Sequence, residues 1–360
     1  MARPPLLKAP AALRDTVLLF GQLGPEESVA GLFGRVDWTG VTRRQLIHAF
    51  LDRPPATAAE ASDGAAFNAS AAALELFASD AFRNDIALRL LKSFPGKRRV
   101  LFVHIPKAAG TDFMAAMRGV LPHVGNELGV KELVPDDRLA LRLRRLARGV
   151  KGSDTIFMGG GHIPLSWYLD EKLYRFNDRL IAIVRHPREM CVSLANYIAN
   201  GLKSDPALSR SDTRGWARAL GLSTNDIATM DARLLALAVV AHPKTQLVNP
   251  ICSLLGDGMA PAALDNLARA CVEITSTEYY DRWLLERWNI VRKLHVNASP
   301  RLIGWDDLHP WQQARIEAGC QQDYIVYDAV TQCLGRSGAS SVTGPEVARF
   351  AREGKASASS

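Results

Sequence analysis

RRVLFVHIPKAAGTDF, residues 98–113, is the stretch that decides the fold expected for this chain. Its apolar run from Val100 to Ile105 is short and rich in β-branched and aromatic residues, which is typical of a buried strand. Pro106 ends the run, and KAAGTD then leads into an apolar helical pattern. The stretch predicts a strand, a tight turn and a helix, an arrangement in which a helix N-terminus and a lysine can bind an anion.

Further strands and helices alternate downstream of this stretch. TIFMGGGHI (155–163) and RLIAIV (179–184) have the composition of strands, and REMCVSLANYIANGL (188–202) has the pattern of a helix. Beyond residue 205 the pattern is mostly helical, over 226–241, 261–270, 279–295 and 310–333. The alternation predicts an α/β fold, a P-loop-like three-layer sandwich with a central parallel sheet.

Two regions flank this α/β domain, which we expect over residues 96–335. Residues 1–95 show helical periodicity and predict a small helical accessory region, with a flexible linker around 52–70 that is rich in proline, alanine and serine. Residues 336–360 have the composition of a disordered tail.

Composition limits the kinds of partner and the cellular compartment that we expect for this chain. The formal net charge of +7 favours anionic partners, although a mild excess of basic residues can also simply keep a protein soluble. The five cysteines include no CxxC, which predicts free thiols in a reducing compartment rather than a zinc site. The apolar run at 234–241 is too short to span a membrane, and the first residues lack the pattern of a secretory signal. We therefore expect a cytoplasmic protein without a transmembrane segment.

The turn after the first strand differs from the usual nucleoside-triphosphate loop. That loop has glycine, lysine and a hydroxyl residue in direct succession. Here Lys107 comes three residues before Gly110, and no hydroxyl residue follows the lysine to bind magnesium. A kinase that uses ATP is therefore a weaker interpretation of the turn.

A second motif follows another strand, in IAIVRHPREMCVSLANY (181–197). Arg185 ends the strand, Pro187 comes two residues later, and Ser193 comes eight residues after the arginine. An arginine offers several planar donors to a phosphate, and a serine hydroxyl can add another.

Together the two motifs resemble those of the PAPS-dependent sulfotransferases, particularly the carbohydrate (Golgi and heparan-type) enzymes whose loop reads HIPKTGGT or HIPKTAGT. This chain has HIPKAAGT at 104–111, with Ala108 in place of the common threonine. His186 stands where aspartate is commoner in the second motif, and Met190 replaces a frequent arginine. The likeness extends over about residues 98–335, weakly after 205, and residues 1–95 have no counterpart in it.

The resemblance implies a donor, 3′-phosphoadenosine 5′-phosphosulfate (PAPS), and residues that bind it. Arg185 and Ser193 would hold the 3′-phosphate, and Lys107 would stabilise the leaving phosphate oxygen during transfer. No metal is implied. The residues expected around the phosphosulfate are Lys107, Ala108, Ala109, Gly110, Thr111 and Asp112.

His162 is the candidate general base, because it follows a strand and three glycines and because imidazole titrates near neutrality. The resemblance supports this role, since the family carries a Gly-His pair after an early strand. The alternative is a histidine that caps the strand end through hydrogen bonds. Glu189 is a weaker base candidate, His104 fits a structural role, and Asn249 is a candidate to line the site.

The acceptor is less well indicated than the donor. The basic stretch at 136–152 could bind an acidic polysaccharide, or it could be an amphipathic helix with its leucines packed inward. Trp167 and Tyr168 could stack on a sugar or could belong to the core. No interleaving of aromatic and basic residues points to nucleic acid, and the sequence does not indicate an oligomeric state.

The sequence thus predicts a cytoplasmic, bacterial sulfotransferase that acts on a hydroxyl acceptor, most simply a carbohydrate or glycoconjugate. One alternative is a P-loop-type kinase. The other is a non-catalytic protein that binds a nucleotide and uses residues 1–95 for interaction.

Overall fold

The computed structural model describes most of the chain: residues 6–24, 27–51, 53–64, 67–79, 82, 98–125, 143–144, 147–148, 152–159, 162–170, 178–243, 248–291 and 300–358. The chain divides into two compact units. The first unit comprises Met1–Phe102, Met117–Ile163 and Glu171–Arg179. The second comprises Val103–Ala116, Pro164–Asp170 and Leu180–Ser360.

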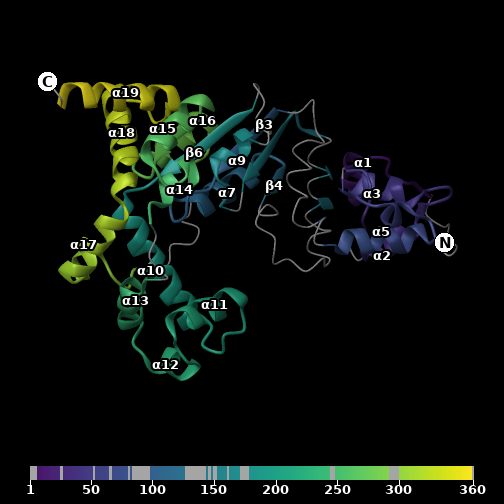
Figure 1. The fold of residues 1–360 in the computed structure, drawn as a ribbon, viewed down its shortest axis with the longest axis horizontal. Helices are drawn as coiled ribbons and strands as arrows, with labels where there is room; N and C mark the ends of the chain where they lie inside the picture. The colour runs from purple at the N-terminus through teal and green to yellow at the C-terminus, as the bar shows by residue number, and fades with distance from the viewer. Residues whose placement is uncertain are drawn as a thin grey trace. The chain divides into compact units, whose positions relative to one another are not determined.

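Helices form the N-terminal part of the first unit (Figure 1). A short strand pair, β1 (Leu7–Lys8) and β2 (Val36–Asp37), runs parallel beside them. Their core is a cluster of aromatic rings whose centroids lie 5.3 to 6.5 Å apart, made by Phe20, Phe33, Phe50, Phe77 and Phe82. The helices are α1 (Leu13–Phe20), α2 (Val29–Gly34), α3 (Arg43–Leu51), α4 (Ala58–Ala61) and α5 (Ala69–Ala78).

The predicted linker around 52–70 contains local structure. Helix α4 begins after Thr57, whose side chain accepts from the Glu60 N–H. Glu60 in turn accepts two hydrogen bonds from the Arg53 guanidinium, at 2.7 and 3.0 Å. A bidentate arginine pair fixes both side chains, so this part of the segment is a folded turn rather than a free linker.

Two described pieces of the basic stretch pack on the N-terminal helices of the first unit. Arg144 Nη1 donates to the Gly24 carbonyl and Arg148 Nε to the Gly21 carbonyl, both at 3.4 Å. Leu143 and Ala147 are buried, as the amphipathic interpretation of 136–152 requires. These contacts explain why the first unit crosses the boundary expected at residues 95 and 96. The rest of the stretch lies outside the described residues.

The six main strands form a sheet in the order β4-β5-β3-β6-β7-β8. The pairs β4–β5, β3–β5 and β6–β7 are parallel, and β7–β8 is antiparallel. The prediction of an α/β fold with a mostly parallel sheet is thus confirmed at this level, and β6 has the predicted bounds. The strands are β3 (Arg98–Val103), β4 (His123–Gly125), β5 (Thr155–Gly159), β6 (Arg179–Val184), β7 (Glu273–Ser276) and β8 (Val342–Thr343).

The second unit contains most of the helices. Helix α10 is the longest of them, and α11, α12 and α13 lie around its C-terminal half (Figure 1). Buried apolar side chains of α10, including Ile198 and Leu202, pack there on Leu235 and Val239 of α13. The helices are α7 (Gly110–Arg118), α9 (Leu165–Asp170), α10 (Pro187–Ser204), α11 (Ser211–Leu220), α12 (Thr224–Thr229), α13 (Ala232–Ala241), α14 (Pro250–Gly256), α15 (Ala260–Arg269), α16 (Tyr280–Trp288), α17 (Pro310–Gly319), α18 (Gln321–Ser337) and α19 (Gly344–Ala358).

The C-terminal segment differs from the prediction of disorder over 336–360. Its residues form the end of α18, strand β8 and helix α19. Val342 and Val347 are buried, and the Gly344 N–H donates to the Val272 carbonyl at 2.8 Å. Gly338, Ala339 and Ser340 lie between α18 and β8, and Arg349 and Arg352 are exposed on α19, while the two buried valines pack on the unit. Helix α19 lies beside α15 in Figure 1.

Candidate functional site

The turn between β3 and α7 has the backbone of an anion-binding loop. Lys107 and Ala109 adopt left-handed conformations, with φ of 61° and 59°, and Ala108 between them does not. Alternation of handedness turns successive N–H groups toward one side of the chain and forms a concave nest for an anion. A left-handed alanine costs about 1 kcal/mol, a strain that is typical of functional loops.

Gly110, the first residue of α7, is required by the packing of this turn. A Cβ at Gly110 would lie 2.1 Å from His104 Cδ2 and 2.3 Å from His104 Nε2. The imidazole therefore occupies the space that any larger residue would need, and it fixes the start of the helix against the end of β3. Thr111, next in the helix, is exposed and Asp112 is half-buried.

Arg185 connects the turn to the second motif. It follows the last residue of β6, and its Nη1 donates to the Lys107 carbonyl at 3.2 Å. Its Nη2 lies 3.7 Å from Glu189 Oε2, one helical turn further along the chain. Burial lowers the pKa of the guanidinium, while Glu189 and Glu278 act in the opposite direction. The two motifs, 78 residues apart, therefore meet at the turn.

The Lys107 ammonium lies in the same place. Its Nζ is 4.2 Å from the centroid of the Tyr197 ring, on helix α10. Burial, and then repulsion from Arg185, lowers the pKa of Lys107 to about 8. A cation with weakened hydration beside a second cation is a strong site for an anion.

One face of α10 completes the site. Glu189, Ser193 and Tyr197 are spaced four residues apart, so they lie above one another on the helix surface. Glu189 contacts Arg185 at one end of this row, and Tyr197 contacts Lys107 at the other. Half-buried Ser193 lies between them on the same face. Three predicted binding residues, Lys107, Arg185 and Ser193, are thus brought together.

Tyr197 was missed by the sequence reasoning. Its side chain is 43% exposed and does not belong to the core. The signal that could have identified it is its position one helical turn after Ser193, on the helix that follows Arg185.

His186, which stands where the motif that the sequence resembles more commonly has aspartate, packs on α18. Its ring packs edge-on against Tyr324 and Tyr327 of α18, with centroids 5.5 and 5.1 Å apart. Burial is the main cause of its lowered pKa, so its neutral form is favoured. The histidine thus anchors the start of α10 to α18. Beside it and Arg188 opens a cavity of about 550 Å³.

The candidate base lies in the other unit. His162 is exposed and follows β5, as predicted, and it belongs to the first unit whereas Lys107 belongs to the second. Gly160 and Gly161, which precede it, lie outside the described residues. The catalytic role of His162 stays a prediction.

Asn249 and Tyr168 have structural roles. The Asn249 Oδ1 accepts from the Gln322 N–H at 3.0 Å, so the amide joins the start of α14 to that of α18. Its place in the lining of the site stays a prediction. Tyr168 is 1% exposed in α9, and burial raises its pKa. It belongs to the core, one of the two interpretations that the sequence left open.

No family model, no curated protein and no solved structure matches this chain. Within the described ranges, no group of three or more histidine, cysteine or acidic side chains could hold a metal ion. The same part of the chain contains no helix that is long and apolar enough to cross a membrane.

Proposed function

We propose that this chain is a sulfotransferase that moves the sulfuryl group of PAPS to a hydroxyl acceptor, most simply on a carbohydrate. The observation that carries the proposal is the hydrogen bond from Arg185 to the Lys107 carbonyl, because it joins the expected phosphosulfate loop to the expected 3′-phosphate arginine. A donor with two separate anionic groups needs two cations. Lys107 and Arg185 are both half-buried, so each can still contact a ligand.

The residues fit the donor by their chemistry. The left-handed turn at Lys107 and Ala109 offers backbone N–H groups, which suit the oxygens of a phosphosulfate. Arg185 offers a planar set of donors to the 3′-phosphate, and Ser193 adds a hydroxyl on the adjacent face of α10. Thr111 and Asp112 occupy the first turn of α7, where the hydroxyl can add a donor to the same anion.

In the proposed reaction the acceptor oxygen forms a bond to sulfur while the bond between sulfur and the bridging phosphate oxygen breaks. Lys107 stabilises the negative charge that collects on that leaving oxygen. His162 takes the proton of the acceptor hydroxyl. The products are a sulfate ester and adenosine 3′,5′-bisphosphate, and positioning and charge neutralisation provide the rate, as in phosphoryl transfer.

Calorimetry with adenosine 3′,5′-bisphosphate tests the binding half of the proposal. Arg185→Ala should weaken the affinity by about tenfold or more, because a hydrogen bond to a charged group contributes roughly 1.5–3 kcal/mol. Arg233→Ala is the matched control, since Arg233 carries the same charge on α13 and pairs with Asp307. Equal binding by Arg185→Ala and the unmodified chain would sink the site. Magnesium-dependent ATP turnover without bisphosphate binding would instead support the kinase alternative.

Transfer of labelled sulfate from PAPS to a panel of oligosaccharides tests the catalytic half. His162→Ala should abolish transfer while the affinity for the bisphosphate stays within about twofold, because a general base contributes roughly 10²–10⁴-fold to the rate. Loss of both properties would identify a structural histidine. Binding without transfer in the unmodified chain would favour the non-catalytic alternative.

A further inference from the structure

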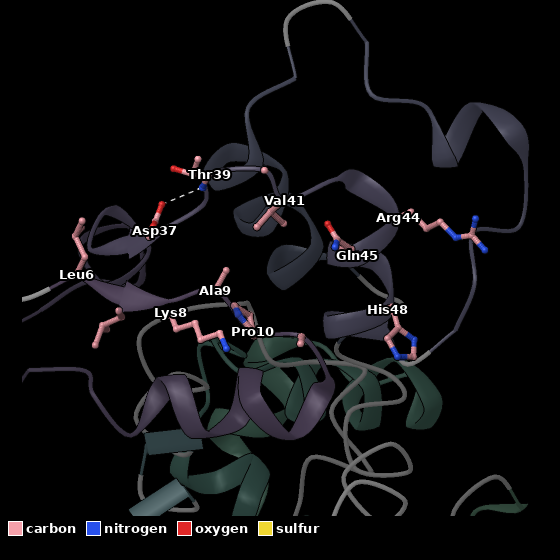
Figure 2. Close-up of a pocket in the computed structure, with 13 residues that line it drawn as sticks. Leu6, Lys8, Ala9, Pro10, Asp37, Thr39, Val41, Arg44, Gln45 and His48 are labelled. Carbon is pink, nitrogen blue, oxygen red and sulfur yellow. Dashed lines mark hydrogen bonds between the residues drawn. The ribbon is translucent and has the colours of Figure 1, made fainter.

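The first unit contains a cavity of about 780 Å³ between two segments of its N-terminal part, 6–11 and 37–48 (Figure 2). Its two walls are held at fixed positions. Strand β1 pairs with β2, Leu7 opposite Val36. The turn after β2 closes with a hydrogen bond of 3.1 Å from the Val41 N–H to the Trp38 carbonyl, and Gly40 supplies the positive φ of 73° that this turn needs.

Aliphatic side chains form part of the lining of the cavity. Leu7, Pro10 and Val41 contribute aliphatic surface, and Pro10 is buried. The first wall leads into α1 and the second into α3, and these helices contribute Phe20 and Phe50 to the phenylalanine cluster of this unit. The volume falls in the range of sites that bind small organic molecules, roughly 300–1,000 Å³.

The polar side chains of the lining carry an excess of positive charge. Lys8, Arg44 and His48 are exposed, and within the described part of the chain none of their side chains forms an ion pair or a hydrogen bond. Asp37, the one acidic residue of the lining, already accepts a hydrogen bond of 3.0 Å from the Thr39 N–H. Its acceptor capacity is therefore partly used.

The basic side chains of the lining point in different directions (Figure 2). Asp37 is joined to Thr39 along one side of the cavity, Lys8 lies beside Pro10, and Arg44 points away from the other labelled side chains (Figure 2). Lys8 is thus the cation best placed for a ligand that rests on the aliphatic lining.

From this combination we propose that the cavity binds a small aliphatic anion. Its apolar chain contacts Leu7, Pro10 and Val41, and its single carboxylate or sulfate head contacts Lys8. The site uses no residue of the proposed donor site, and the two can be tested apart. It gives residues 1–95 a ligand-binding role.

Calorimetric titration with sodium octanoate, sodium octyl sulfate and 1-octanol tests the proposal. Both anions should bind about fivefold or more tightly than the alcohol, because the three probes share a chain and differ in the charge of the head. Lys8→Gln should remove this difference. Arg43→Gln is the matched control for Lys8→Gln, because it also removes one positive charge from this part of the chain. Arg43 does not line the cavity, and its guanidinium lies 3.7 Å from the Glu75 carboxylate. Val41→Asp should abolish binding of both anions, with a thermal melt to confirm that the variant folds.

Four results would overturn the proposal: no binding of either anion, equal binding of 1-octanol, equal weakening by Lys8→Gln and Arg43→Gln, or unchanged binding in a folded Val41→Asp variant. Lys107→Met separates this site from the donor loop. It should bind octanoate as the unmodified chain does, and loss of octanoate binding in that variant would place the anion at the donor loop instead.

Discussion

Two effects act in the same direction on the Lys107 ammonium. Burial removes part of its hydration and Arg185 repels it, and together they lower its pKa to about 8. A bound anion would counter both effects, because it stabilises the charged form. Binding of a phosphate and protonation of Lys107 are therefore thermodynamically linked.

The affinity for adenosine 3′,5′-bisphosphate should consequently fall as the pH rises through about 8. Below that pH the free ammonium is already charged, whereas above it binding must first protonate the amine, which costs about 1.4 kcal/mol, or tenfold, per pH unit. Calorimetry on either side of pH 8 measures the change. Lys107→Arg should show no such fall, because a guanidinium stays charged throughout this range. A pH-independent affinity in the unmodified chain would contradict the lowered pKa.

Glu189 competes with any anion for Arg185, since its carboxylate lies 3.7 Å from the guanidinium. Glu189→Gln should raise the affinity for the bisphosphate by about two- to fivefold, the range expected for a partly exposed ion pair. Glu286→Gln, which removes an exposed carboxylate paired with Arg282 on α16, is the control and should have no effect. A weaker affinity in Glu189→Gln would mean that the carboxylate orients Arg185 for binding.

At the scale of single residues, the sequence predicted the cations of the site but not what surrounds them. Lys107, Arg185 and Ser193 belong to motifs with recognisable spacing. The contact of Arg185 with the Lys107 carbonyl, and of Lys107 with Tyr197, joins positions 78 and 90 residues apart. Such contacts depend on the order of the strands in the sheet, which local pattern does not specify.

At the scale of elements, the start of α7 depends on the fit of Gly110 to the His104 ring. Gly110→Ala should lower the free energy of unfolding by about 1–3 kcal/mol, the range for an overpacked site, and it should also weaken bisphosphate binding because the loop must shift. Urea unfolding and calorimetry measure the two effects.

A second substitution tests the cause of that loss. His104→Ala in the Gly110→Ala background should restore part of the binding, because it removes the clashing ring. Gly215→Ala is the control for the substitution itself. Gly215 lies inside α11 with nothing within 4 Å of an added Cβ. Its replacement should stabilise the chain by roughly 0.5–1 kcal/mol. If Gly110→Ala behaved like Gly215→Ala, the packing argument would be wrong.

Elements with strong local signals were predicted closely. The β6–α10 region was found because a buried strand, a helix-starting Pro187 and an apolar period follow one another directly. Strand β8 and helix α19 were missed, because β8 has only two residues and gains its stability from pairing with β7, about 70 residues earlier. Pairing over such a distance leaves no trace in local composition.

At the scale of the whole molecule, the α/β class followed from the alternation of elements, and the division into units did not. The first unit includes segments on both sides of the expected boundary at residues 95 and 96, because the stretch around Arg144 and Ala147 packs on the N-terminal helices. The second unit includes the C-terminal segment, because Val342 and Val347 complete its core.

The C-terminal segment therefore carries the last prediction, since a folded and a disordered tail respond differently to the same change. Val347 is fully buried in α19, and a charge placed there would have no partner. Val347→Asp should lower the free energy of unfolding of the second unit by about 3 kcal/mol or more. Arg352→Ala, an exposed position of the same helix, should change it by less than about 0.5 kcal/mol. Thermal unfolding of both variants distinguishes a folded from a disordered C-terminal segment, because a disordered tail would tolerate both substitutions equally.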